Sequence, residues 1–196
     1  MERYEVRLSG SGGQGIITAG IILAEAAGVY EGKEVCQTQA YGPEARGGAS
    51  KAEVVISDSE IDYPKVIKPD IVLAMNQQAC DTYCYDLKPG GLLIIDATLV
   101  KDIPIPWVIA LPFTQIARQE CGKEMVANIV ALGALVKISG VVSLESLEMA
   151  VLARAPTGTA ELNRQALASG VAAAEQLLSK RLPHCLEEAP NPLARE

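Results

Sequence analysis

The sequence predicts an α/β fold in which helices flank a mainly parallel sheet and the C-terminal half is rich in helix. Predicted strands and helices alternate over the first half of the chain. Two continuous apolar runs, 70–75 and 92–96, are typical of parallel strands buried on both faces. No linker or internal repeat divides the chain. We therefore expect one domain over residues 1–180, and a disordered tail over 181–196, where prolines and glutamates gather.

The first predicted elements form a strand, a turn and a helix. Apolar and polar residues alternate over 4–8, which indicates a strand, and a glycine-rich turn follows at 10–15. Apolar residues then recur at helical spacing, which predicts a helix over 16–29. Further strands are expected at 34–38 and 50–56, with a Gly/Pro-rich loop at 39–48 between them.

The elements of the second half are marked by their boundaries. Asn76 follows the buried strand 70–75 and is placed to cap a helix that ends near Leu87, before Lys88-Pro89-Gly90-Gly91. After the strand at 92–96, a proline-rich stretch leads to a short strand at 107–111. The remaining helices are predicted at 114–119, 123–138, 144–154 and 159–178.

Charge and residue usage exclude several classes of function. Of the 196 residues, 17 are Lys or Arg and 24 are Asp or Glu, a net charge of −7 that disfavours general binding to nucleic acid or anionic lipid. No apolar run reaches the roughly 20 residues of a membrane span. Five irregularly spaced cysteines indicate reduced thiols in the cytoplasm. His184 is the only histidine and lies in the tail, which excludes a histidine-dependent triad or zinc site in the folded body.

The turn after the first strand carries the spacing G-x-G-x-x-G at Gly10, Gly12 and Gly15. Glycines allow a sharp turn and a close approach of ligand to backbone, and the N-terminus of the following helix offers N–H groups to a phosphate. The alternative is a tight strand-to-helix turn that binds nothing. A nicotinamide site also needs an acid at the end of the second strand. Residues 35–39 contain none and Glu34 stands at the start, so an ordinary NAD site is disfavoured.

A second loop, Tyr41-Gly42-Pro43-Glu44-Ala45-Arg46-Gly47-Gly48, combines a turn with an acid and a base. By itself it could be a turn held by a Glu44–Arg46 ion pair, worth roughly 0–1 kcal/mol if exposed. Together, the two glycine-rich loops make the chain, over residues 3–178, resemble the gamma subunits of 2-oxoacid:ferredoxin oxidoreductases.

That resemblance implies a Rossmann-like fold and a shared reaction. These enzymes oxidatively decarboxylate a 2-oxoacid with coenzyme A and reduce ferredoxin. The resemblance places thiamine diphosphate, magnesium and iron–sulfur clusters on partner alpha, beta and possibly delta subunits, and it implies that the isolated chain is inactive. The YGPEARGG form of the second loop favours the 2-oxoglutarate branch.

The sequence itself agrees with a reaction that is shared among several subunits. The sequence has no Gly-Asp-Gly thiamine motif and no C-x2-C-x2-C cluster motif. Cys80 and Cys84 supply only half a metal site, and ordinary thiols are the better interpretation. We therefore expect no catalytic residue and no metal ligand on this chain.

We hypothesise that the chain forms one side of a coenzyme A site. Backbone N–H groups of the first loop would receive the pyrophosphate, Arg46 would add a bidentate cationic contact, and Gln14 and Gln39 would act as uncharged donors. Asn128, on an otherwise apolar helix, would bond either a neighbouring loop or the ligand. The candidate residues are Gly10, Gly12, Gly13, Gln14, Gly15, Gln39, Arg46 and Asn128. Two alternatives stay open, a stand-alone dinucleotide-dependent dehydrogenase and a purely structural assembly subunit.

Overall fold

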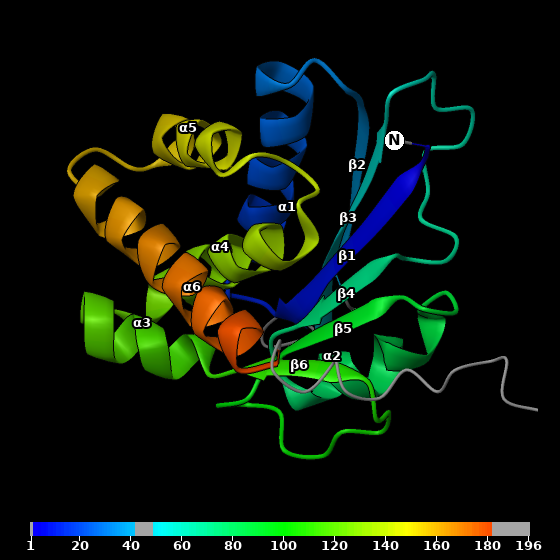
Figure 1. Ribbon diagram of the computed structural model, residues 1–196. Helices are drawn as coiled ribbons and strands as arrows, with labels where there is room; N and C mark the ends of the chain where they lie inside the picture. Colours follow the sequence, from blue (N-terminus) through cyan, green and yellow to red (C-terminus); the bar gives the residue numbers. More distant parts are fainter. Residues whose placement is uncertain (1, 42–48, 182–196) are drawn as a thin grey trace, which may run out of the picture.

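The computed structural model describes residues 2–41 and 49–181, and within them a six-stranded sheet runs through the molecule (Figure 1). The strands lie in the order β2-β3-β1-β4-β5-β6. β1, β4, β5 and β6 are parallel to their neighbours in turn, whereas β3 runs antiparallel to both β1 and β2. The predicted mainly parallel α/β sheet is confirmed. The strands are β1 (Tyr4–Ser11), β2 (Glu34–Tyr41), β3 (Ala49–Ser57), β4 (Ile71–Ala74), β5 (Leu92–Asp96) and β6 (Val108–Leu111).

Helices cover the two faces of the sheet unequally. Figure 1 shows α1, α3, α4, α5 and α6 on one side and α2 on the other. The helices are α1 (Ile16–Glu25), α2 (Gln77–Tyr83), α3 (Phe113–Cys121), α4 (Ala127–Ser139), α5 (Leu144–Arg154) and α6 (Ala160–Arg181), with a π-helical turn at Ala26–Tyr30 and 3-10 turns at Cys84–Asp86 and Glu124–Val126. None of the described helices is long and apolar enough to cross a membrane.

The larger core lies under α1 and α4, and glycines set how closely its elements pack. At Gly170 of α6, an added Cβ would lie 1.9 Å from the Val130 carbonyl oxygen of α4. At Gly20 of α1, it would lie 2.5 Å from the Ala52 Cβ of β3. Neither position has space for a side chain, so α6 packs closely on α4 and α1 packs closely on β3.

The opposite face is apolar under α2 but charged across β1 and β3. Arg7 is 5% exposed, and its guanidinium bonds Glu53, 7% exposed, with 2.7 Å between Nε and Oε1. It also pairs with Asp86 and lies 5.2 Å from the centre of the Tyr83 ring. A buried charge needs such partners, because losing one leaves the other uncompensated. The network therefore holds α2 against the sheet.

Most predicted boundaries agree with the structure to within three residues. β5 and α5 begin and end at the predicted residues, while β1 and β2 each extend three residues further. The helix predicted to end near Leu87 is shorter, since α2 ends at Tyr83 and a 3-10 turn replaces its last residues. The helix predicted over 16–29 changes to a π-helical turn after Glu25. Residues 182–196 of the predicted tail lie outside the described residues.

Candidate functional site

The first glycine loop lies where β1 ends and α1 begins, at the carboxyl edge of the parallel strands. Gln14 ties this loop together. Its Oε1 accepts from the Ser11 N–H at 2.7 Å and from the Ser11 hydroxyl at 3.0 Å, and its Nε2 donates to the Met75 carbonyl at 3.1 Å. The side chain therefore joins the loop to the end of β4, and its polar atoms are engaged inside the chain.

The four glycines of the loop are required for different physical reasons, or are not required by the backbone at all. Gly13 and Gly15 have φ of +95° and +70°, in the region that side chains disfavour. At Gly10, an added Cβ would lie 2.6 Å from Gln14 Oε1. Gly12 is exposed and its φ is not positive, so its backbone conformation does not demand glycine. In loops of this kind such a glycine allows a phosphate to approach the backbone.

Asn128 joins the loop to α4. Its Nδ2 donates to the Gly15 carbonyl at 3.1 Å, and its Oδ1 accepts from the Ile129 N–H at 3.0 Å. An added Cβ at Gly15 would lie 2.4 Å from that Nδ2. Of the two expectations for this residue, the structure shows the bond to the neighbouring loop, and its contact with a ligand stays a prediction.

The N-terminus of α1 is uncapped. Its N-cap, Gly15, provides no side chain, and no described residue accepts from the N–H groups of Ile16, Ile17 or Thr18. The first of the regular bonds joins the Ala19 N–H to the Gly15 carbonyl at 2.9 Å. These free donors, at the positive end of the helix dipole, are suited to an anion.

Two cavities meet at this loop. One of about 260 Å³ is lined by Gly13, Gly15, Thr18 and residues of α4, α5 and α6. The other, about 160 Å³, is lined by Gly13 and Gln14, by Thr114 of α3, and by residues of the 3-10 turn before α4. Gly13 and Met125 line both, and Met125 is 74% exposed. A ligand bound at Gly13 could thus extend in either direction.

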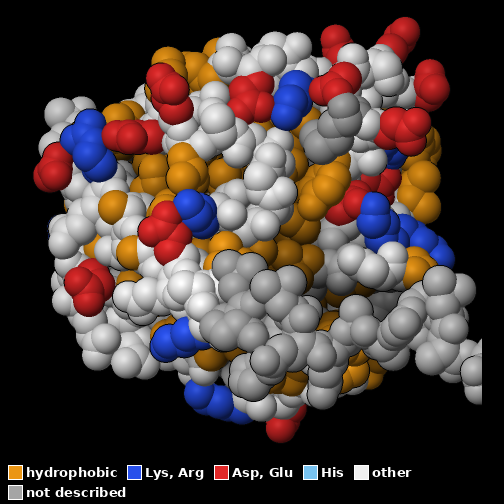
Figure 2. All heavy atoms as spheres, viewed as in Figure 1, with side chains coloured by type: hydrophobic (Ala, Val, Ile, Leu, Met, Phe, Trp, Pro, Cys, Tyr) orange, Lys and Arg blue, Asp and Glu red, His pale blue; other side chains and the backbone are white. Residues whose placement is uncertain are grey.

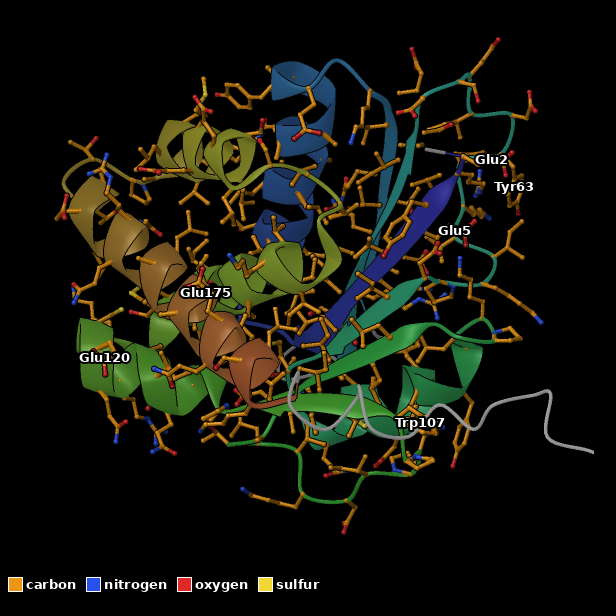
Figure 3. The ribbon with its side chains drawn as sticks, viewed as in Figure 1. Glu2, Glu5, Tyr63, Trp107, Glu120 and Glu175 are labelled. Atoms are coloured by element: carbon orange, nitrogen blue, oxygen red, sulfur yellow. The ribbon has the colours of Figure 1, made fainter. Side chains whose placement is uncertain are left out.

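A larger cavity, about 450 Å³, lies away from the loop. Three acids line it, Glu2 before β1 and Glu60 and Asp62 after β3, against one cation, Arg3. Figure 2 shows acidic side chains crowding the upper right of the molecule, and Figure 3 places Glu2 and Tyr63 there. This acidic surface would repel phosphate, so we place the candidate site at the smaller cavities beside the glycine loop.

The structure brings together most of the predicted residues but not all. Gly10, Gly12, Gly13, Gln14, Gly15 and Asn128 lie around one loop. Gln39 is exposed on β2, opposite Ala52 of β3, which itself pairs with Leu8 of β1. It therefore lies two strands away from β1, about 10 Å at the usual strand spacing. Arg46 lies outside the described residues.

Three polar residues around the cavities were missed by the sequence analysis. Asp96, fully buried at the end of β5, accepts from the Thr114 hydroxyl at 2.5 Å, and Thr114 lines the smaller cavity. Arg154 and Asn163 line the larger one. An acid that ends a buried parallel strand was the available signal for Asp96, since ligands of such sheets bind at that edge. Arg154 and Asn163 lie in helices with no motif.

The cysteine pair fits an ordinary core. Cys80 of α2 and Cys84 of the following 3-10 turn are buried free thiols that face the sheet-side apolar cluster. Burial raises the pKa of Cys80 to about 11, so the thiol stays protonated at neutral pH. Among the described residues, no three His, Cys, Asp or Glu side chains gather as metal ligands would.

Comparison with known proteins assigns the family. Residues 5–173 match the family model of pyruvate ferredoxin/flavodoxin oxidoreductase. The chain belongs to this family. It is 54% identical to the 2-oxoglutarate synthase subunit KorC of Methanocaldococcus jannaschii over 179 residues, 89% of this chain and 96% of that protein.

Two solved structures are also similar. The keto/oxoacid ferredoxin oxidoreductase gamma subunit of Geobacter sulfurreducens has a TM-score of 0.82 and 50% identity, over 90% of this chain and 98% of that chain. The 2-oxoglutarate:ferredoxin oxidoreductase of Magnetococcus marinus, with 2-oxoglutarate, coenzyme A and succinyl-CoA bound, has a TM-score of 0.78 and 25% identity. The match covers 90% of this chain but 32% of that one. The resemblance to the gamma subunits of these oxidoreductases is confirmed.

Proposed function

We propose that the chain is the gamma subunit of a 2-oxoglutarate:ferredoxin oxidoreductase and supplies one side of its coenzyme A site. The complex would convert 2-oxoglutarate and coenzyme A to succinyl-CoA and CO2 while reducing ferredoxin. The KorC relative, matched over almost its whole length, supports the subunit and the substrate. The coenzyme A in the Magnetococcus marinus structure supports the ligand.

Partner subunits complete the proposed enzyme. Thiamine diphosphate, magnesium and iron–sulfur clusters would lie on alpha, beta and possibly delta subunits, and the cytoplasm is the proposed location. The sequence supports this division, because it contains neither a thiamine motif nor a cluster motif. When bound on a partner, thiamine diphosphate supplies the carbanion chemistry of decarboxylation. This chain's part is to bind and orient the co-substrate.

The observation that carries the coenzyme A proposal is the uncapped N-terminus of α1 beside Gly12 and Gly13. The pyrophosphate would accept from the free N–H groups of the first turn, and exposed Gly12 would let it approach. Gln14 and Asn128 would hold the loop in shape, because their polar atoms are already engaged there. Arg46 would add a charge-assisted contact.

Strand order and family weigh against the stand-alone dehydrogenase. In the dinucleotide-binding fold the second strand lies beside the first. Here β3 lies between β1 and β2 and runs the opposite way, so it ends at the other edge of the sheet. The assembly-only alternative is favoured by one surface feature, Trp107, which is 82% exposed and is labelled at the lower right of the molecule in Figure 3.

The test is calorimetry of coenzyme A binding to the assembled complex with Gly13→Asp and Gly13→Asn. An added Cβ at Gly13 has no atom within 4 Å, and the loop forces both substituted residues into the same positive φ. They differ in charge, so we expect Gly13→Asp to weaken binding at least tenfold more than Gly13→Asn, with Arg46→Ala also weakening it. If neither Gly13→Asp nor Arg46→Ala changes the affinity in an intact complex, the coenzyme A role fails and the assembly-only alternative stands.

A further inference from the structure

The 260 Å³ cavity beside the loop is a built pocket between helices. Thr18 and Ile22 line it from α1, Val151 from α5 and Leu162 from α6, and these helices lie together on one side of the sheet (Figure 1). Whole small-molecule sites usually measure about 300–1,000 Å³. A cavity of this size therefore fits part of a large ligand, and its mostly aliphatic walls suit a flat apolar group.

Asn163 is a nearly buried polar residue in the lining of this cavity. It is 8% exposed, and its Nδ2 donates to the Thr159 carbonyl at 2.9 Å and to the Thr159 hydroxyl at 3.1 Å. Its Oδ1 accepts no hydrogen bond from the described part of the chain. Because the amide nitrogen is committed, the residue offers the cavity an acceptor. The group that fits is a hydrogen-bond donor on a flat ligand.

The charge of the cavity suits a phosphorylated ligand. Among the described lining residues, Arg154 is the only charged one, and no acid faces the ligand space. The Arg154 guanidinium is anchored by Glu25, with Nε 2.6 Å from Oε2 and Nη2 2.5 Å from Oε1. Gly13 and Gly15 also line the cavity, so a phosphate at the loop would lie beside the apolar space.

We infer that this cavity holds the adenine end of coenzyme A, with Asn163 Oδ1 accepting from the exocyclic amine of the base. This assignment rests on the proposed function for the phosphate position. Adenine is a flat ring with an N6 amino donor. The opposite arm of coenzyme A carries the thiol, which must reach chemistry on another subunit. The nucleoside is therefore the end that this chain retains.

The ligand-side test compares coenzyme A with 1,N6-etheno-CoA, in which the amine is blocked, on the assembled complex. We expect the etheno analogue to bind about tenfold more weakly, as the loss of a buried hydrogen bond implies. In Asn163→Leu the two ligands should bind equally, because the discriminating acceptor is gone. This difference between ligands is independent of any general loss of stability in the variant.

The protein-side test blocks the cavity at Thr18, which is exposed on the first turn of α1. Thr18→Trp should weaken coenzyme A binding at least tenfold, whereas Val29→Trp, a matched change at a 71% exposed residue outside the cavity lining, should not. Equal affinities for the two ligands in the unaltered complex, or an unaffected Thr18→Trp, would overturn the cavity assignment. If Gly13→Asp still weakens binding in that case, the proposed function survives. If Gly13→Asp has no effect, the proposed function itself fails.

Discussion

The N-termini of α1 and α2 follow parallel neighbouring strands, yet they are completed in different ways. At α2, the Asn76 side chain accepts from the Ala79 N–H at 2.8 Å. At α1, Gly15 stands in the same position, and no described side chain caps the first turn. α5 resembles α2, since Ser143 accepts from the Ser146 N–H at 3.0 Å.

The difference separates a helix start used for stability from one available to a ligand. A side-chain cap satisfies a backbone donor that otherwise needs water or another partner. α1 gives up that contribution and instead has glycines that leave its N–H groups open. The start of α1 is held instead by Asn128, which donates to the Gly15 carbonyl, and by Gln14, which donates to the Met75 carbonyl. Neither bond occupies the N–H groups of the first turn. Each of the following predictions tests one side of this contrast.

The largest effect is expected from Gly15→Ala. The substitution places a side chain at φ +70° and puts its Cβ 2.4 Å from Asn128 Nδ2, which breaks the contact that holds the loop to α4. We expect a loss of about 3 kcal/mol in the free energy of unfolding. Gly13→Ala is the matched control, because it has a positive φ but open space, and it should cost about 1 kcal/mol. Urea unfolding measures both, and equal losses would contradict the role of Asn128.

Local signals predicted the elements better than their directions. The run of apolar residues marks β5, and apolar residues at helical spacing mark α5, because both signals lie within the element itself. Reversal of β3 was not predicted, since an alternating pattern is the same in either direction. Its position between β1 and β2 follows from pairing across the sheet, which no short segment encodes.

The same limit applies to the site. The glycine loop was predicted because its spacing is local, whereas its supports come from far along the chain. Asn128 bonds Gly15 across 113 residues, and Gln14 bonds Met75 across 61. Asn128 was noticed only as a polar residue on an apolar helix. Asn163 was missed for two reasons. It bonds Thr159, at the start of the same helix, as many helical residues do, and the cavity that it lines forms only when α1, α5 and α6 pack together.

A smaller effect is expected from removing the cap of α2. Asn76→Ala should lower the free energy of unfolding by about 1 kcal/mol, because the Ala79 N–H loses its acceptor. Asn76→Asp keeps an acceptor and should stay close to the original stability. Neither change should alter coenzyme A affinity in the complex. A clear loss of affinity in Asn76→Ala at unchanged complex assembly would contradict the division between a structural and a ligand-facing helix start.

The smallest expected effect is on the pKa of a thiol, which reports the electrostatic field at the N-termini of α1 and α2. Thr18→Cys places an exposed thiol in the first turn of α1, where the uncapped N-terminus should lower its pKa. Ala168→Cys, exposed in the middle of α6, is the matched control. Iodoacetamide modification, followed by peptide mass spectrometry across pH, should show an earlier midpoint for Thr18→Cys by about half a unit. Cys80 should stay unmodified near neutral pH, because burial in the first turn of α2 outweighs the helix dipole and raises its pKa to about 11. Coincident midpoints for the two introduced thiols would show that α1 offers no more field to an anion than the middle of a helix does.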